Sequence, residues 1–172
     1  MQVIVNAYPV DILTPHYRVY GELRTRGDPT IFLNDEANAT LTVHDATLIP
    51  LRQGMRLGAV AMDELHIPKH EPQVITMGEY TPDIRPLPKV ERLICFTDTY
   101  LLRGTFHMSP ETRTNDVFYS RQSLFFAVTD LDTYSLYPLA VEVKARSALA
   151  YLRGGSVRAF YKAAEEGAPL PE

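Results

Sequence analysis

A pattern that occurs twice constrains this chain more than any other feature of its sequence. The two occurrences are Thr14, Tyr17, Val19, Gly21 and Leu23, and then Thr97, Tyr100, Leu102, Gly104 and Phe106. The spacing within the pattern is identical, and the second occurrence follows the first by 83 residues in a chain of 172. Internal repeats have to be recognised before elements are counted, because each copy is one structural unit. The sequence therefore predicts two tandem copies of one unit.

Within each copy, apolar and polar side chains alternate with a period of two. The alternation covers residues 17–24 and returns in residues 100–107. Strict alternation is typical of a half-buried strand, since successive side chains point to opposite faces of a sheet. Gly21 and Gly104 fall on the apolar face, where a glycine usually marks a bulge or a sharp bend. We expect a strongly curved strand in each copy.

Further strand candidates define the extent of each copy. They are Val3–Tyr8, Leu41–Asp45, Arg56–Met62, Gln73–Met77, Glu91–Phe96, Phe126–Asp130 and Ala140–Lys144. Four or five short strands per copy suit a small barrel or sandwich. The predicted fold class is all-β, with two tandem small curved β-barrel or sandwich repeats and a short C-terminal helix.

The predicted boundaries follow from prolines and from helix signals. The first repeat occupies residues 1–77, and residues 78–90 form a linker because closely spaced prolines favour extended connections. The second repeat occupies residues 91–155. In the tail, residues 156–172, a helix is expected over Ser156–Glu166, with Ser156 as its cap and Gly167 as its stop. Its apolar stripe would pack on the core or on a neighbouring molecule.

The motif of the second copy resembles a small bacterial β-domain of unknown function. The residues that carry the resemblance are Thr97, Tyr100, Leu102, Gly104, the connection His107–Arg113 and the strand Phe126–Asp130. The first copy departs from the motif, with His44 in place of Thr129. The resemblance implies a small β-barrel similar to those of Sm-like proteins, and it brings no activity or catalytic residue with it.

Charge, cysteine content and hydropathy exclude several classes of protein. The formal net charge is -4 and the isoelectric point is about 5.7, so no overall field attracts polyanions. Cys95 is the sole cysteine and lies in an apolar run, which predicts a buried, inert thiol and excludes an intrachain disulfide. We find neither a signal peptide nor a run of eighteen apolar residues, and we expect a cytoplasmic protein without a membrane span.

The sequence gives only weak signals of catalytic or metal-binding residues. Asp45 and Asp130 could bind a cation or act as general bases, but aspartate also begins turns, and we interpret them as turn residues at strand ends. His66 and His70, with Asp63 and Glu71, offer metal ligands, although Pro68 prevents the two histidines from sharing a helix face. His16, His44 and His107 have no adjacent nucleophile, and the segment Arg153–Ser156 is most simply a turn. No catalytic residue, cofactor or metal is predicted.

One polar face is a candidate binding surface. Arg18, Arg24 and Arg26 share it, with Tyr20 between them, as in surfaces that bind nucleic acids. Glu22 and Asp28 interleave with these arginines, so ion pairing across strands is the simpler interpretation.

Three functional hypotheses follow. The first is a non-enzymatic structural or protein-interaction module built from a duplicated β-barrel, which associates with itself through unpaired strand edges. The second is a nucleic-acid or nucleotide-binding module that uses the arginine face. The third is a flavin-binding split-barrel enzyme, an analogy from fold alone. We favour the first hypothesis.

Overall fold

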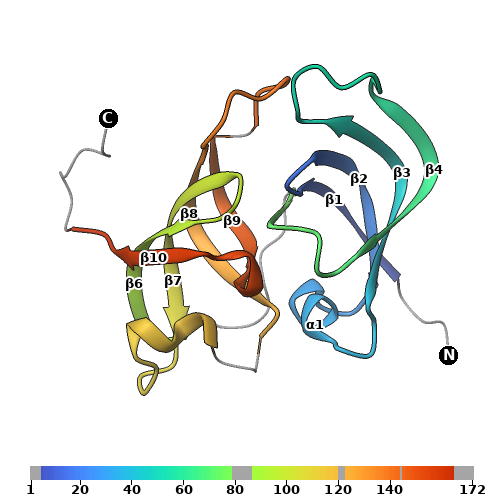
Figure 1. Cartoon of the computed structure of the whole chain (residues 1–172). Coiled ribbons are helices and arrows are strands. Elements are labelled where there is room, and N and C mark those ends of the chain that lie inside the picture. The colour runs from blue at the N-terminus through green and yellow to red at the C-terminus, as the bar shows by residue number, and fades with distance from the viewer. Residues whose placement is uncertain (1–4, 79–86, 120–122, 144, 165–172) are drawn as a thin grey trace, which may run out of the picture.

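The computed structural model describes residues 5–78, 87–119, 123–143 and 145–164, and it is predominantly β (Figure 1). The strands are β1 (Val5–Leu13), β2 (Tyr17–Arg26), β3 (Thr40–Pro50), β4 (Val60–Pro68), β5 (Val74–Met77), β6 (Lys89–Phe96), β7 (Tyr100–Met108), β8 (Phe125–Ser135), β9 (Arg146–Arg153) and β10 (Ala159–Lys162). They form one open ten-stranded sheet in the order β10-β6-β7-β8-β9-β5-β1-β2-β3-β4, in which neighbours are antiparallel. The all-β fold class is confirmed. Most of the predicted linker lies outside the described residues, and β6 begins at Lys89, inside its predicted range.

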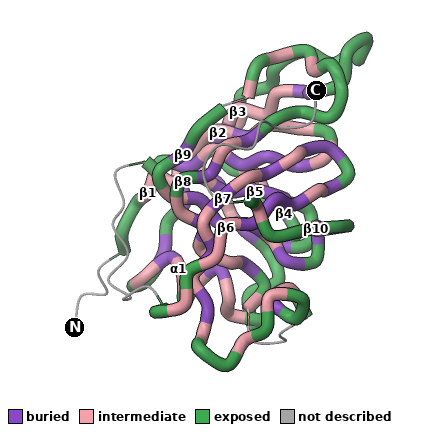
Figure 2. The backbone as a smooth tube through the Cα atoms, turned by 90° about the vertical axis from the view of Figure 1, so that its left-hand side faces the viewer, coloured by how far each residue is buried: buried purple, intermediate pink, exposed green. Residues whose placement is uncertain are grey.

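The sheet curls into two lobes that lie side by side (Figure 1). One lobe contains β1 to β4 and the short helix α1 (Pro29–Asn34); the other contains β6 to β10 and the 3-10 helix η1 (Thr114–Tyr119). Two hydrophobic clusters form the core. One contains Leu23 and Val43 together with Tyr151 of the second lobe, and the other contains Phe106 and Val128 together with Leu13 of the first lobe. Figure 2 shows the buried segments gathered inside the molecule and the turns exposed.

The two halves of the sheet hold the same strand order and the same register. β5-β1-β2-β3-β4 in the first half corresponds to β10-β6-β7-β8-β9 in the second. Pairs that correspond at an offset of 83 are Val10 with Gly21 and Leu93 with Gly104; pairs at an offset of 85 are Val43 with Leu65 and Val128 with Ala150. The offset of 85 also relates α1 to η1. The second half therefore has two more residues between Gly104 and Val128 than the first half has between Gly21 and Val43.

The threonine and tyrosine of the repeated motif close the turns that lead into β2 and β7. The Tyr17 backbone N–H donates to the Oγ1 of Thr14, and the Tyr100 N–H donates to the Oγ1 of Thr97, at 2.9 Å in both turns. Both threonines are buried. A side-chain acceptor at this point satisfies a backbone donor that the strand ladder does not reach.

The glycines of the motif lie at bulges, as expected. The register between β2 and β3 shifts around Gly21, and the register between β7 and β8 shifts around Gly104. A Cβ atom on Gly21 would lie 2.5 Å from the Cγ1 of Val43, and one on Gly104 would collide with Val128. Close approach of the next strand therefore excludes a side chain at either position.

The aspartates expected at strand ends lie within strands. Asp45 is in the middle of β3 and Asp130 is in the middle of β8, with exposed side chains. Their φ angles are 48° and 49°, in the left-handed region that aspartate tolerates better than most residues. The prediction of strand ends was wrong because the bulge lets each strand bend and continue.

The predicted C-terminal helix is also wrong. Residues 154–156 form the 3-10 turn η2, and residues 159–162 form β10, which pairs with β6 through Phe160 opposite Cys95. A short run with Phe160 and Tyr161 fits a strand as well as a helical stripe, and pairing with a strand edge decides between them.

Two predicted strands are displaced. The chain from Ala140 to Val143 is irregular, and the strand follows at β9; residues 56–59 are likewise a loop before β4. Helix α1, which the sequence did not predict, begins with Pro29 after Asp28, whose carboxylate accepts from the Thr30 N–H at 2.7 Å.

Candidate interaction edges

The junction between the two lobes is a strand pair. β5 and β9 are antiparallel neighbours, with Ile75 opposite Tyr151. At one end of the pair the Arg153 backbone N–H donates to the Gln73 carbonyl at 3.0 Å, and the Arg153 Nε donates to the Pro72 carbonyl at 2.9 Å. The lobes are therefore joined by main-chain hydrogen bonds as well as by side-chain packing.

Side chains from the second lobe are buried against helix α1 of the first. The Tyr151 ring is fully buried, and its hydroxyl lies 2.7 Å from the Thr30 Oγ1. The Asn34 side chain forms two hydrogen bonds with the Phe125 backbone, accepting at 2.9 Å and donating at 3.2 Å. Side chains of α1 thus add hydrogen bonds between the two lobes beside the β5–β9 strand pair.

Two residues of the repeated motif take part in this junction. The Tyr100 hydroxyl donates to the Thr14 carbonyl at 3.2 Å, and the Thr97 Oγ1 donates to the Gln73 Oε1 at 2.7 Å. Burial raises the pKa of Tyr100 well above its usual value, so its hydroxyl remains a donor at neutral pH. Thr14 enters this contact through its backbone carbonyl, whereas Thr97 and Tyr100 enter it through their side chains.

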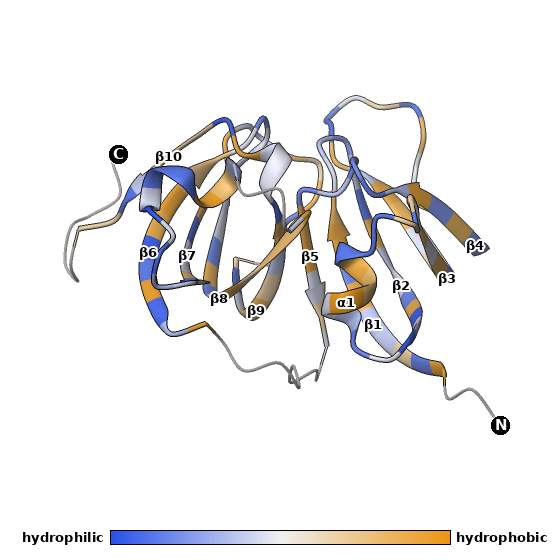
Figure 3. Cartoon of the chain, turned by 90° about the horizontal axis from the view of Figure 1, so that it is seen from below, coloured by the Kyte–Doolittle hydropathy of each residue, from blue (hydrophilic) through white to orange (hydrophobic). Residues whose placement is uncertain are grey.

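The strands at the two ends of the sheet are β10 and β4. They lie at opposite ends of the molecule in Figures 1 and 3, so they cannot meet within one chain. An end strand has a row of unpaired N–H and C=O groups along one side, and these groups can pair with another strand.

Backbone alternation identifies the residues whose main-chain groups face outward. The Ala163 N–H donates to the Arg92 carbonyl of β6, so Phe160 and Lys162 direct their N–H and C=O groups away from β6. In the same way the Lys69 N–H donates to the Ala39 carbonyl, which leaves Glu64 and His66 facing outward from β4. Both edges have the main-chain groups needed for a further antiparallel partner.

The two edges carry opposite charges. Exposed Asp63 and Glu64 lie on β4, whereas exposed Lys162 ends β10 and Arg158 precedes that strand. Arg158 forms a bidentate hydrogen-bonded pair with Asp98, which holds the pKa of that carboxyl below its usual value. In Figure 3 hydrophilic and hydrophobic residues alternate along β4.

The three arginines of the candidate binding surface do share one face of β2. They lie opposite Leu13, Ala7 and Val5 of β1, in an unbroken register. Arg18 donates to both carboxylate oxygens of Asp11, at 3.1 and 2.8 Å, and its guanidinium stacks 4.4 Å from the Tyr20 ring centroid. Burial lowers the pKa of Arg18, but the hydrogen bond and charge of Asp11 outweigh it and leave that pKa raised.

Arg18 also donates to the Glu142 carbonyl in the other lobe, while Arg24 pairs with Glu22 at 2.7 Å. Arg26 is exposed at the strand end. Two of the three arginines are thus neutralised by carboxylates, and Arg18 serves the contact between lobes. This arrangement weakens the case for a polyanion surface on β2.

The histidine-rich segment does not assemble a metal site. His66 Nε2 lies 3.3 Å from Glu64, and His70 Nε2 lies 3.2 Å from Glu71. Lys69, between them, is buried and donates to the Phe32 and Asp35 carbonyls at the end of α1. Among the described residues, no group of three histidine, cysteine, aspartate or glutamate side chains could hold a metal ion.

Two further residues that the sequence singled out, His107 and Cys95, lie on β7 and β6 of the second lobe. His107 Nε2 lies 2.9 Å from the Thr129 Oγ1, across β7 and β8. Cys95 is fully buried in the second lobe, and burial raises the pKa of its thiol to about 12. Such a thiol stays protonated at neutral pH and is a poor nucleophile.

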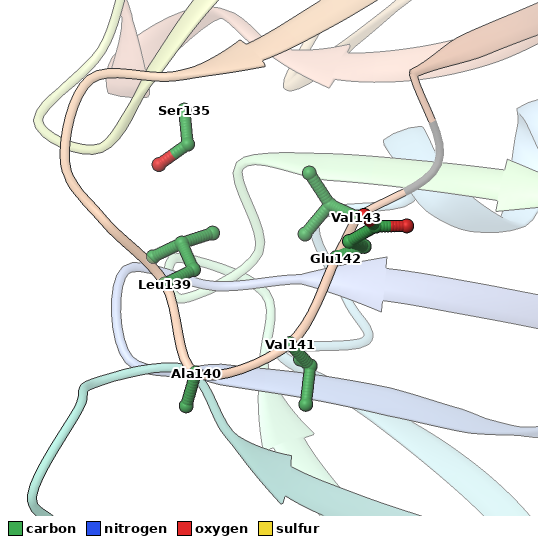
Figure 4. A pocket seen from close by; sticks show the side chains of 6 residues that line it. All are labelled: Ser135, Leu139, Ala140, Val141, Glu142 and Val143. Carbon is green, nitrogen blue, oxygen red and sulfur yellow. The ribbon is translucent and has the colours of Figure 1, made fainter.

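Two shallow hollows of about 300 Å³ each lie beside the connection between β8 and β9. Figure 4 shows the first, which is lined by Ser135, Leu139, Ala140, Val141, Glu142 and Val143. Its lining has one carboxylate and no base beside a nucleophile, so it lacks the constellation that acid–base or nucleophilic catalysis requires.

No helix in the described ranges is long and apolar enough to cross a membrane.

The sequence did not identify the β10 edge, although one signal was available. Extending the repeat at an offset of 85 places Ile75 in line with Phe160, which marks residues 159–162 as the counterpart of β5. The helical stripe predicted there obscured this correspondence.

Comparison with known proteins gives no information on function. No protein-family model matches the chain, and neither a curated protein nor a solved structure matches it significantly.

Proposed function

We propose that this chain is a tandem duplication of one five-stranded, barrel-like unit and that it functions as a self-associating structural module. The observation that supports the proposal is the position of the two end strands. β4 has the same place in its half as β9, and β10 has the same place as β5. Because β5 and β9 pair with each other, β10 of one molecule and β4 of another can pair in the same way.

Association between these edges is head to tail. Each molecule offers two different edges at opposite ends, so the contact joins unlike surfaces of two copies. A head-to-tail contact closes into a ring when the rotation between copies allows it, and otherwise extends into a filament. The module thus supplies a repeating framework rather than a catalytic site.

The polar side chains and the thiol whose contacts are given above agree with such a role. The motif residues support turns, bulges and the lobe junction, and the buried thiol and buried lysine are structurally engaged. Functional sites usually gather perturbed ionisable groups in a concave pocket, and the described hollows do not contain such a gathering.

Light scattering after size-exclusion chromatography tests the proposal. At micromolar concentration we expect a mass above the 19.4 kDa of one chain. Lys162→Pro removes an outward N–H from β10 and should reduce the mass, while the control Lys162→Ala keeps that N–H and should have a smaller effect. A strictly monomeric wild-type protein up to high micromolar concentration would contradict the proposal.

A further inference from the structure

We infer that β10 of one molecule receives β4 of a second copy in a single register, with Lys162 opposite Glu64 and Phe160 opposite His66. The inference rests on the proposed self-association and specifies the strand, register and contacts that mediate it. The template is the junction already present between β5 and β9.

The register follows from the correspondence between the two halves. Ile75 lies opposite Tyr151 at the lobe junction. Phe160 has the place of Ile75 on its own lobe, because Ile12 opposite Ile75 corresponds to Cys95 opposite Phe160. The corresponding pairs are Thr42 with His66 on the first lobe and Ala127 with Tyr151 on the second. Transferring the junction to the outer edges therefore places His66 opposite Phe160.

The outward-facing main-chain groups agree with this register. Phe160 and Lys162 face outward on β10, and His66 and Glu64 face outward on β4. In an antiparallel ladder, residues that face each other in this way form the narrow hydrogen-bonded pairs, which recur at every second residue. A slip by one residue would lose both pairs and turn every side chain to the other face.

Charge selects the same register. Two residues beyond the Phe160 and His66 pair, Lys162 comes directly opposite Glu64, and both side chains are exposed in the single chain. Directly opposed side chains have Cβ atoms about 5 Å apart, and an opposite-charge pair there is favourable. The corresponding place at the lobe junction has Met77 and Leu149, so the ion pair would be specific to the contact between molecules.

Exposed aromatic residues surround the proposed contact. Tyr119, at the end of η1, is 78% exposed and has the place that Asn34 has beside the lobe junction. Tyr161 on β10 is 45% exposed and stacks on Phe96 at 6.3 Å between ring centroids. A docked strand would cover apolar surface that the single chain leaves in water.

Pro68 makes the outer contact weaker than the inner one. It has the place of Arg153, whose N–H donates to the Gln73 carbonyl at 3.0 Å. Proline has no N–H, so this hydrogen bond has no counterpart between molecules. The association is consequently reversible, while the lobe junction within each chain stays intact.

Charge reversal tests the register. In Lys162→Glu alone, or in Glu64→Lys alone, like charges oppose each other at every contact, and we expect the dissociation constant to rise roughly tenfold at low salt. An equimolar mixture of the two variants restores opposite charges at every contact when the two alternate. The double variant, which carries both Lys162→Glu and Glu64→Lys, restores opposite charges at contacts between identical molecules. Sedimentation equilibrium measures all four samples, with exposed Arg56→Glu as the control for the change in net charge.

The possible outcomes distinguish a failure of the proposed register from a failure of the proposed self-association on which it rests. Weakened single variants with a restored mixture and a restored double variant support the register. A wild-type protein that associates, with single variants that associate equally well or a mixture that stays weak, overturns the register and leaves self-association standing. A wild-type protein that remains monomeric overturns both. Circular dichroism of each variant verifies that the exposed substitutions leave the fold intact.

Discussion

Asp45 and Asp130 hold the same left-handed backbone conformation, with φ of 48° and 49°, at positions 85 residues apart. Each lies opposite a glycine of the neighbouring strand, Gly21 or Gly104, where the ladder register shifts. The left-handed residue and the facing glycine together bend a long strand, so that one sheet can enclose two separate clusters of apolar side chains.

The bulge aspartates predict a distinctive pattern of substitution. Asp130→Ala should destabilise the protein by about 1 kcal/mol, because a residue with a Cβ and without a short polar side chain is strained at positive φ. Asp130→Gly should cost less, since glycine adopts this conformation without strain. Urea denaturation measures both variants, and equal losses for alanine and glycine would argue against backbone strain as the cause.

Gly104 predicts a coupling with Val128. Gly104→Ala should cost about 1–3 kcal/mol, because the added methyl group collides with the Val128 side chain. Val128→Ala removes the colliding Cγ atoms, so the double variant should be more stable than the sum of the single losses implies. A double-mutant cycle of unfolding free energies measures this coupling, and strict additivity would be inconsistent with the collision.

Cys95 predicts resistance to thiol reagents. Because burial raises the pKa of its thiol to about 12, the folded protein should react negligibly with a disulfide reagent at pH 8. The same reagent should label one thiol per chain in denaturant. The unfolded thiol loses its proton near pH 9 and the folded one does not, so this group makes stability fall as pH rises from about 9 toward 12. Rapid labelling of the folded protein would show that Cys95 is accessible.

Pro68 predicts a gain of association. Pro68→Ala restores an outward N–H on the β4 edge at the place where Arg153 donates at the lobe junction. One added hydrogen bond of about 1 kcal/mol should lower the dissociation constant roughly fivefold. Pro110→Ala, in an exposed turn outside β4 and β10, is the matched control. Sedimentation equilibrium compares the two variants, and an unchanged dissociation constant for Pro68→Ala would place the contact elsewhere.

Much of the local structure was predictable because it depends on neighbouring residues. Alternation identified β2 and β7, and the glycines marked the bulges that Val43 and Val128 impose. Side-chain periodicity alone did not predict the tail, since Phe160 suits a strand or a helix and pairing with the edge of β6 decides between them. The site shared this difficulty: the outer edges become recognisable only when strand order is known.

The sequence by itself determined the alternation, the special backbone positions and the repeated motif, because these depend on side-chain period and steric limits along the chain. Tertiary structure alone decided that β5 pairs with β9, that Arg18 is held by Asp11 and the other lobe, and that β4 and β10 lie at opposite ends. These relationships join residues distant in sequence, and their energy comes from burial and pairing that exist only after the sheet has folded over its two clusters.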